Sequence, residues 1–243
     1  MTELNPDLLL RAYAIGVFPM ADSRQAEEVF WVEPRRRAII PLDQFHLSRS
    51  LRKVIRSDRF RVTRDRAFHE VVRACADREE TWINDSIEAS YGVLHSRGFA
   101  HSVECWIGDD LVGGLYGVRL GAAFFGESMF STRTDASKVA LAWLVARLRV
   151  GGFRLLDCQF MTEHLRSLGA TEIGQKDYLA LLDSALSWTG GSSAGDVVAG
   201  AGSLAAGAGA GADFGALERL FSATGVDSGA PGWLIAQLLG HTS

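Results

Sequence analysis

The stretch that decides the fold is FRLLDCQ at residues 153–159, which follows a Gly-Gly pair at 151–152. Its apolar run ends in polar residues, which predicts a short buried strand with two polar side chains at its C-terminal end. Alternate residues of a strand face the same side, so Asp157 and Gln159 are expected on one face and Cys158 on the other. A carboxylate beside an amide can hold a reacting amine or hydroxyl and relay a proton. The same residues could equally cap the next helix and satisfy a loop, so both interpretations stay open at this point.

A three-stranded meander is expected before this strand, with strands at residues 102–107, 111–118 and 122–130. A helix with an apolar stripe follows at 135–149 and leads into 153–159. Four glycines inside the meander mark bulges or the close approach of a ligand: Gly113, Gly114, Gly117 and Gly126. This order of meander, helix, strand and helix resembles the GNAT acyltransferase fold, in which the sheet splays open and an acyl donor enters the gap.

The fold class we expect is α/β (α+β): a GNAT-like core with a mixed, mostly antiparallel sheet and flanking helices, plus a small N-terminal domain. Further helices are expected at residues 6–15, with Asn5 as the N-cap, and at 48–56, 67–76, 86–97, 162–167 and 177–186. Further extended segments are expected at 39–41 and 60–63, and residues 29–32 form a short apolar run stopped by Glu33 and Pro34.

Three regions are expected along the chain: a small N-terminal domain at 1–35, a GNAT-like catalytic domain at 36–189 and a C-terminal extension at 190–243. Residues 190–213 contain eight Gly, eight Ala and three Ser without Lys or Arg, which predicts a flexible linker. The short amphipathic pieces at 214–221 and 233–239 could dock on the core or on a partner, or be disordered. We expect the extension to be dispensable for chemistry, because the linker cannot bury enough apolar surface to order itself.

The composition is that of an ordinary globular protein, with 243 residues, 47% hydrophobic, 22% charged and a net charge of −4. Because no stretch of 18 apolar residues and no N-terminal secretory signal occurs, we expect neither a membrane span nor export. The three cysteines, Cys75, Cys105 and Cys158, are odd in number and widely spaced. They form no metal-binding pattern and favour a reducing compartment, so we expect a cytoplasmic protein.

The basic residues are concentrated in one segment. Residues 35–66 contain eleven Lys and Arg against three Asp, a local charge of +8 in an otherwise acidic chain. Arg49, Arg52, Lys53 and Arg56 follow helical spacing, which predicts a basic helix face. An arginine-rich face of this kind suits phosphate contacts, and the alternative is a solvated face without a function.

Nine short strings keep their order over residues 8–187, about three quarters of the chain: AYAIGVFP (12–19), LSRSLR (47–52), TWI (81–83), HSVE (101–104), LVGGLYGV (111–118), GESMFS (126–131), DASK (135–138), DCQ (157–159) and SLGA (167–170). One such string would be weak evidence, whereas nine in order are specific. Together they resemble the leucyl/phenylalanyl-tRNA–protein transferase family. Members of that family commonly carry an aromatic residue where this chain has Met20.

The resemblance implies an enzyme that moves Leu, Phe or sometimes Met from aminoacyl-tRNA to the α-amino group of proteins with an N-terminal Arg or Lys. The product is an N-degron that directs the acceptor protein to proteolysis. The implied partners are Leu-tRNA, Phe-tRNA and those acceptor proteins, with the basic face of Arg49, Arg52, Lys53 and Arg56 on the tRNA phosphates. No metal, no organic cofactor and no membrane are implied, and we expect a monomer.

The resemblance also implies roles for individual residues. Gln159 would hold the attacking amine, and Asp157 would polarise Gln159 or relay the proton. An acceptor with a cationic side chain needs an anionic pocket, and Glu127 is its first candidate unless it is paired with Arg133 at a strand end. Trp82 would pack near the terminal adenosine of the tRNA by stacking, although without the family it would be taken as core.

An apolar pocket is expected for the transferred side chain, because Leu and Phe are apolar and unbranched at Cβ. The candidates, each of which could equally be ordinary core, are Leu115, Phe125, Met129, Leu144, Leu148 and Leu156.

Two other functions remain open from the sequence. A GNAT-type acyl-CoA N-acyltransferase would usually hold pyrophosphate with a Gly-rich turn before the helix, but the turn at 131–135 reads STRTD, without glycine. A non-catalytic RNA-binding module would use the basic face but would leave Glu127 and the DCQ string unexplained.

Overall fold

A mixed sheet of seven strands forms the centre of the computed structural model, which describes residues 4–188, 211–225 and 231–240. The strands of this sheet are β3 (Arg36–Ile39), β4 (Arg61–Arg64), β5 (Ala100–Ile107), β6 (Asp110–Leu120), β7 (Ala123–Ser131), β8 (Leu155–Gln159) and β9 (Thr171–Gly174). They lie in the order β4-β5-β6-β7-β8-β3-β9, and only the β7–β8 pair is parallel. A separate antiparallel pair, β1 (Phe18–Met20) and β2 (Phe30–Val32), belongs to the N-terminal part. The expected mixed, mostly antiparallel sheet is confirmed.

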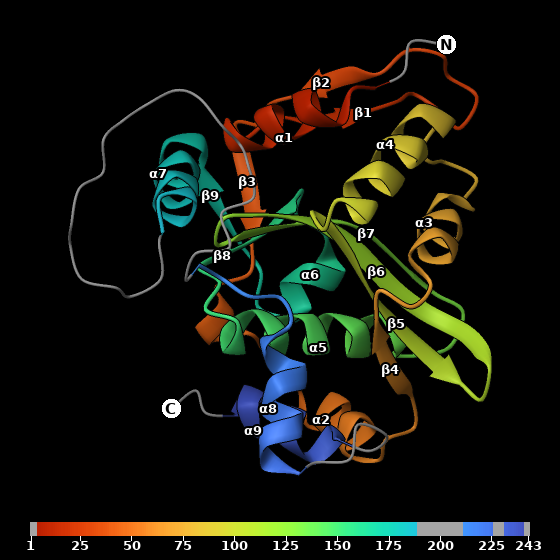
Figure 1. Cartoon of the computed structure of the whole chain (residues 1–243), viewed down its shortest axis with the longest axis vertical. Coiled ribbons are helices and arrows are strands. Elements are labelled where there is room, and N and C mark those ends of the chain that lie inside the picture. The colour runs from red at the N-terminus through yellow and green to blue at the C-terminus, as the bar shows by residue number, and fades with distance from the viewer. Residues whose placement is uncertain (1–3, 189–210, 226–230, 241–243) are drawn as a thin grey trace.

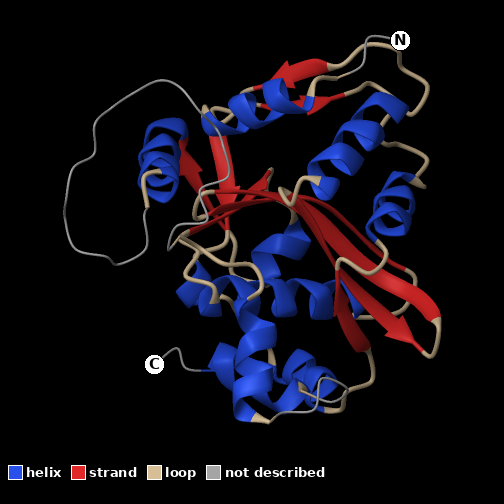
Figure 2. Ribbon diagram, in the orientation of Figure 1, coloured by secondary structure: helices blue, strands red, loops and turns tan. Residues whose placement is uncertain are grey.

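Helices cover both faces of the sheet (Figure 1, Figure 2). The helices are α1 (Pro6–Ala14), α2 (Arg49–Arg56), α3 (Phe68–Ala76), α4 (Asp85–Ser96), α5 (Ala136–Val150), α6 (Glu163–Ser167), α7 (Gln175–Leu186), α8 (Ala216–Thr224) and α9 (Gly232–Gly240). None of the helices in the described part of the chain combines the length and apolarity needed to cross a bilayer.

Side-chain caps explain where several helices begin. The Asn5 side chain accepts hydrogen bonds from the backbone N–H groups of Asp7 and Leu8, so α1 starts at Pro6 as expected. Ser48 caps α2 and Asn84 caps α4 in the same way. Because each cap satisfies an otherwise unpaired donor, the helices at 6–15, 48–56 and 86–97 could be located from the sequence, and the structure confirms them within two residues.

The parallel pair β7–β8 separates after only three residue pairs. The register runs from Ala123↔Leu155 to Phe125↔Asp157 and ends there, although β7 continues to Ser131. On its other edge, β8 stays paired with β3 to its end, through Ile39↔Asp157 and Ala38↔Gln159. An opening therefore forms beside the second half of β7, and the residues that follow Phe125 and Asp157 border it.

Two of the meander glycines allow close packing of the protein against itself. A Cβ on Gly117 would lie 2.3 Å from the carbonyl oxygen of Phe125, at the bulge between Tyr116 and Gly117. A Cβ on Gly113 would lie 2.5 Å from the Cβ of Ala136, where α5 crosses the sheet. At these two positions the close approach predicted from the sequence is made by the chain's own strand and helix rather than by a ligand.

The main elements that the sequence did not predict are the short strands β1, β2 and β9, together with the first half of β3. The segment at 39–41 was expected to be extended, but β3 begins earlier, at Arg36. Arg37, one of the eleven basic residues counted at 35–66, is 1% exposed and lies inside the sheet. Its burial could not be recognised from the run of three arginines, because only the pairing of β3 with β8 brings it to its partner Asp157.

The first part of the C-terminal extension that is described docks on α5. The phenyl ring of Phe214 stacks on that of Phe124 at 5.4 Å and on the imidazole of His101 at 4.2 Å. Arg147 of α5 donates to the carbonyl oxygen of Phe214 and forms an ion pair with Glu218 of α8. Most of the linker expected at 190–213 lies outside the described residues. The amphipathic piece beyond it is thus part of the packed core.

The second helix of the extension, α9, packs against both α2 and α5. The backbone N–H of Gly232 donates to Oδ1 of Asp58 at 2.8 Å, and Arg149 of α5 donates to the carbonyl oxygen of Leu238 at 2.8 Å. Ile235 and Leu239 are buried in this contact. We therefore expect removal of the extension to cost stability, whatever it does to the chemistry.

Phe214→Ala should lower the free energy of unfolding by about 3–5 kcal/mol, because it removes a buried ring and leaves a cavity between α5 and the sheet. Phe30→Ala is the matched control, since that ring is exposed on β2 and its loss should change stability by less than about 0.5 kcal/mol. Urea unfolding followed by fluorescence measures both. Equal stability of the two variants would show that the extension does not dock in solution.

Candidate active site

A cavity of about 250 Å³ opens where β7 and β8 separate. Leu115 of β6, Leu141 and Leu144 of α5, and Leu156 of β8 make its wall largely apolar. Polar groups from the two separating strands, Glu127 and Gln159, border the same space. Further residues that line the cavity include Trp82, Met129, Cys158, Phe160 and His164. The cavity thus combines an apolar wall with one polar pair, as binding sites for small apolar groups commonly do.

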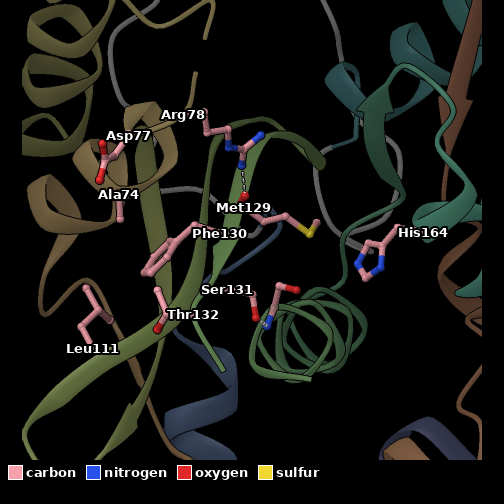
Figure 3. A pocket seen from close by; sticks show the side chains of 10 residues that line it. Ala74, Asp77, Arg78, Leu111, Met129, Phe130, Ser131, Thr132 and His164 are labelled. Carbon is pink, nitrogen blue, oxygen red and sulfur yellow. Dashed lines mark hydrogen bonds between the residues drawn. The ribbon is translucent and has the colours of Figure 1, made fainter. Parts of the chain in front are cut away.

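A second, wider pocket of about 510 Å³ adjoins this cavity (Figure 3). Arg78, Met129 and His164 line both spaces. Figure 3 shows Arg78 bonded to the carbonyl oxygen of Met129, with the His164 ring across from it. The rest of the wider pocket is lined by the hydroxyl side chains of Ser131, Thr132 and Ser137 together with Ala74, Asp77, Leu111 and Phe130. It offers a polar approach to the apolar cavity.

Gln159 reaches the cavity because its backbone is in the left-handed region, with a φ of 61°. This conformation is uncommon for a residue with a side chain, and it breaks the alternation of β8 at its last residue. The amide Nε2 of Gln159 then donates to Oε1 of Glu127 at 3.1 Å. A single backbone torsion therefore brings the ends of the two separated strands into contact.

Asp157 lies on the other side of β8, fully buried and outside the cavity lining. Its carboxylate accepts hydrogen bonds from Nη2 of Arg37 at 2.6 Å, from Nε of Arg37 at 2.9 Å and from the hydroxyl of Tyr178 at 2.9 Å. It also accepts the backbone N–H of Gln159 at 2.8 Å. The sequence placed Asp157 and Gln159 on one face and Cys158 on the other, but Cys158 is the neighbour that lines the cavity. Asp157 instead fixes the backbone that carries Gln159.

The guanidinium of Arg37 is enclosed on every side that the structure describes. It lies 4.6 Å from the ring centres of both Phe18 and Tyr178, and its Nη1 donates to the carbonyl oxygen of Gly16 at 3.0 Å. Burial lowers its pKa, but the hydrogen bonds and the charge of Asp157 outweigh burial, so the pKa of Arg37 is raised. The pair is therefore a buried salt bridge that holds the guanidinium of Arg37 in its charged form.

Glu127 is the carboxylate among the residues that line the cavity. Its Oε1 accepts the hydroxyl of Tyr13 at 2.7 Å, and its Oε2 accepts the hydroxyl of Tyr91 at 2.8 Å. Burial raises the pKa of Glu127 to about 7, against the hydrogen bonds from Tyr13, Tyr91 and Gln159, which lower it. Arg133, the alternative partner considered from the sequence, donates instead to the carbonyl oxygen of Thr132.

Seven of the residues predicted from the sequence line this one cavity: Trp82, Leu115, Glu127, Met129, Leu144, Leu156 and Gln159. Three do not. Asp157 and Leu148 are buried beside it, and the ring of Phe125 packs against Tyr13 at 4.7 Å. The sequence missed Tyr13, Tyr91 and Arg37, because a buried tyrosine on an amphipathic helix cannot be told from ordinary core before its partner is known.

The basic helix face lies apart from the cavity. Arg49, Lys53 and Arg56 are exposed on α2, and Arg52 is half-buried beside the C-terminal end of α9. α2 packs on α5 and α9, and Figure 1 places it beyond α5 from the sheet. A ligand that used both the face and the cavity would have to extend around α5.

The described residues contain no group of three or more His, Cys, Asp or Glu side chains arranged to hold a metal ion. The polar groups that line the cavity include the amide of Gln159, the carboxylate of Glu127, the imidazole of His164 and the guanidinium of Arg78.

Comparison with known proteins gives consistent matches. The family model described as leucyl/phenylalanyl-tRNA protein transferase matches residues 39–183, and the model of the N-terminal domain of the same transferase matches residues 2–35. A leucyl/phenylalanyl-tRNA–protein transferase of Rhizorhabdus wittichii is 68% identical over 206 residues, covering 83% of this chain and 79% of the relative. The proteins of the same description from Zymomonas mobilis and Paramagnetospirillum magneticum are 63% and 58% identical, over 76% and 78% of this chain and 70% and 92% of theirs.

Arg37→Met should lower the free energy of unfolding by about 3–5 kcal/mol, because it leaves the Asp157 carboxylate buried without a counter-charge. Arg36→Met is the matched control, since Arg36 pairs with Glu172 at the same 2.6 Å but at the surface. Its loss should cost less than about 1 kcal/mol. Urea unfolding measures both variants, and similar losses would show that the Arg37–Asp157 pair is not the buried pair that the structure describes.

Proposed function

This chain belongs to the leucyl/phenylalanyl-tRNA protein transferase family, and on that premise we propose how its cavity carries out the transfer. The protein is an aminoacyltransferase that moves leucine or phenylalanine from aminoacyl-tRNA to protein N-termini. The acyl-CoA transferase and the non-catalytic RNA-binding module left open by the sequence are set aside by family membership. Cleavage of an ester by an amine requires that the two reactants be held together and that protons be moved, and each requirement can be assigned to residues of the site.

The apolar wall is proposed to take the side chain of the transferred amino acid. Leu115, Met129, Leu144 and Leu156 line one space together, and Leu141 joins them from α5. These side chains come from β6, β7, α5 and β8, and four of the five are at most 3% exposed, so the wall is rigid and dry. A leucyl or phenylalanyl side chain would fill it at a gain that grows with the apolar area buried.

The terminal adenosine is proposed to rest on Trp82, whose indole lines the cavity from the loop between α3 and α4. An aromatic face binds an unpaired base by stacking. Further tRNA phosphates are proposed to lie on the basic face of α2, through Arg49, Arg52, Lys53 and Arg56. The exposure of three of these four side chains supports that assignment.

Gln159 and Glu127 are proposed to receive the acceptor N-terminus. The observation that carries this proposal is the contact of 3.1 Å between Gln159 and Glu127, which places an amide and a carboxylate at the polar edge of an apolar cavity. The amide oxygen of Gln159 would accept an N–H of the attacking amine, and Glu127 would complement its charge. Asp157 would act through Gln159, whose backbone N–H it accepts, as a positioning residue.

Several finer statements complete the proposal. Leucine, phenylalanine or methionine is placed on proteins with an N-terminal Arg or Lys, and the product is an N-degron. The enzyme acts in the cytoplasm, where aminoacyl-tRNA is made, as a monomer whose cavity is complete within one chain.

The core is GNAT-like, supported by the meander β5–β7 and by the opening between β7 and β8. The division at 35–36 is supported by the separate family models on its two sides, and residues 190–243 form an extension of the catalytic domain.

Gln159→Ala should lower the single-turnover rate of labelled Leu transfer from Leu-tRNA to an Arg-initiated peptide by about 10²-fold, with little change in donor affinity. The reason is that Gln159 would contact the amine as it attacks, an interaction stronger in the transition state than in the ground state. Gln175→Ala, which removes a surface amide bonded to Glu33, is the matched control and should transfer normally. A wild-type protein that transfers no Leu would contradict the function, and a normal rate for Gln159→Ala would contradict the role of that residue alone.

The triple variant Arg49→Glu, Lys53→Glu and Arg56→Glu should raise the KM for Leu-tRNA and flatten its dependence on salt, by about 0.7–0.9 in the log–log slope for each phosphate that the protein no longer neutralises. Leucyl-adenosine, which carries the ester without the phosphates of the tRNA, should remain an equally good donor because the cavity is unchanged. Lys176→Glu, an exposed reversal on α7, controls for net charge. An unchanged KM for Leu-tRNA in the triple variant would show that the basic face does not contact the tRNA.

A further inference from the structure

Tyr13, Tyr91 and Glu127 form a closed ring of three short oxygen–oxygen contacts at the edge of the cavity. The two phenol oxygens lie 2.5 Å apart, Tyr13 lies 2.7 Å from Oε1 of Glu127, and Tyr91 lies 2.8 Å from its Oε2. The three side chains come from α1, α4 and β7. Both tyrosines are fully buried and Glu127 is 8% exposed, so the ring is largely withdrawn from solvent while one member still borders the cavity.

The number of protons in this ring depends on Glu127. Each hydrogen bond uses one proton, and each phenol supplies one, so an ionised Glu127 leaves two protons for three contacts. One contact would then bring two lone pairs together at hydrogen-bond distance. A proton on Glu127 completes the ring, because Glu127 can donate to Tyr91, Tyr91 to Tyr13 and Tyr13 back to Glu127. The geometry of the ring accommodates an added proton.

Glu127 is the member of the ring that titrates near neutral pH. Burial raises the pKa of both Tyr13 and Tyr91 well above the usual range, so the phenols stay protonated. Burial raises the pKa of Glu127 only to about 7. The other ionisable groups that face it are Tyr116 from β6, Asp157 from β8 and Arg37 from β3, with Arg78 across the cavity.

The transfer needs a group of this kind. The α-ammonium of the acceptor has a pKa of roughly 7.7–8.0 and must lose a proton before its nitrogen can attack the ester carbonyl. On the basis of the proposed function, we propose that the ring of Tyr13, Tyr91 and Glu127 accepts this proton from the acceptor ammonium. Glu127 is then a catalytic base of the transfer, and Tyr13 and Tyr91 are positioning residues that orient its carboxylate.

The steps balance without any further reactant. An N–H bond of the ammonium breaks and an O–H bond on Glu127 forms, while the nitrogen keeps the electron pair. The neutral amine then forms a C–N bond with the ester carbonyl, the C–O bond to the ribose breaks, and a second proton of the nitrogen passes to the departing ribose oxygen. Glu127 finally releases its proton to solvent. One ammonium and one ester give one amide, one ribose hydroxyl and one proton.

The dependence of kcat/KM on pH separates this role from that of a fixed anion. Proton transfer needs Glu127 ionised, so kcat/KM for an Arg-initiated peptide should rise through about pH 7 and level off above about pH 8, where the acceptor amine is already free. Glu127→Gln can use only the free amine, so its rate should rise through about pH 8, and its loss of rate relative to wild type should shrink by about two- to threefold between pH 7.5 and pH 9. A fixed anion would instead help most when both groups have lost their protons.

The tyrosines provide the second measurement. Tyr91→Phe removes a hydrogen bond that lowers the pKa of Glu127, so the rising limb of the wild-type profile should move up by about one pH unit. Tyr116→Phe is the matched control for that limb, because the buried hydroxyl of Tyr116 has no hydrogen-bond partner among the described residues, and the limb should stay in place.

Two results would overturn the inference while the proposed function stands. One is a loss of kcat/KM in Glu127→Gln, relative to wild type, that grows towards pH 9. Glu127 would then act as a fixed anion for the acceptor. The other is a rising limb that Tyr91→Phe leaves unmoved, which would reduce the tyrosines to packing. Wild-type protein that transfers no amino acid at any pH would overturn the proposed function and this role with it.

Discussion

The structure depends on one buried ion pair, between Arg37 of β3 and Asp157 of β8. Arg37 contacts three parts of the chain. Its Nε and Nη2 donate hydrogen bonds to the carboxylate of Asp157. It also lies against the rings of Phe18 and Tyr178, and its Nη1 donates to the carbonyl oxygen of Gly16. Two charges held out of water cost several kcal/mol each, so the pair is stable only if every remaining donor and acceptor is satisfied. That requirement fixes β3, α7 and the N-terminal segment relative to β8, and it fixes the backbone from which Gln159 enters the cavity.

The opening between β7 and β8 turns this rigid frame into a site. Parallel strands that stay paired leave no room between them, whereas these two part after Phe125 and Asp157, while the end of β8 stays paired with β3 on its other edge. The released part of β7 carries Glu127, and the end of β8 carries Gln159. In a low-dielectric cavity the hydrogen bond between them and those from Tyr13 and Tyr91 are stronger than they would be in water. The same burial keeps the pKa of Glu127 near neutrality, where a proton can be exchanged.

The C-terminal extension shows how a segment beyond the matched family region can become part of the core. Phe214 enters between α5 and the sheet, and α9 fills the space between α2 and α5. The carbonyl oxygen of Ile55 lies so close to Gly232 that a Cβ there would clash at 2.0 Å. The helix that carries the basic face is therefore held in place by residues far along the chain, which ties the expected phosphate contacts to the packing of the extension.

Local patterns in the amino-acid sequence were enough to locate most elements and to identify the family. Period-2 and period-3.6 patterns, caps such as Asn5 and turn glycines act over a few residues, so they placed most helices and strands, and nine ordered strings pointed to the relatives. Five of the seven predicted cavity residues lie in those strings: Trp82, Leu115, Glu127, Met129 and Gln159. The side of β8 that faces the cavity became known only from the folded chain, because Gln159 leaves strand alternation at a positive φ and Asp157 turns to Arg37. Folding also joined Tyr13, Tyr91 and Glu127, which lie 36 to 114 positions apart. A buried polar group is stable only with its partner, and pairing at such separations is set by packing rather than by any local pattern.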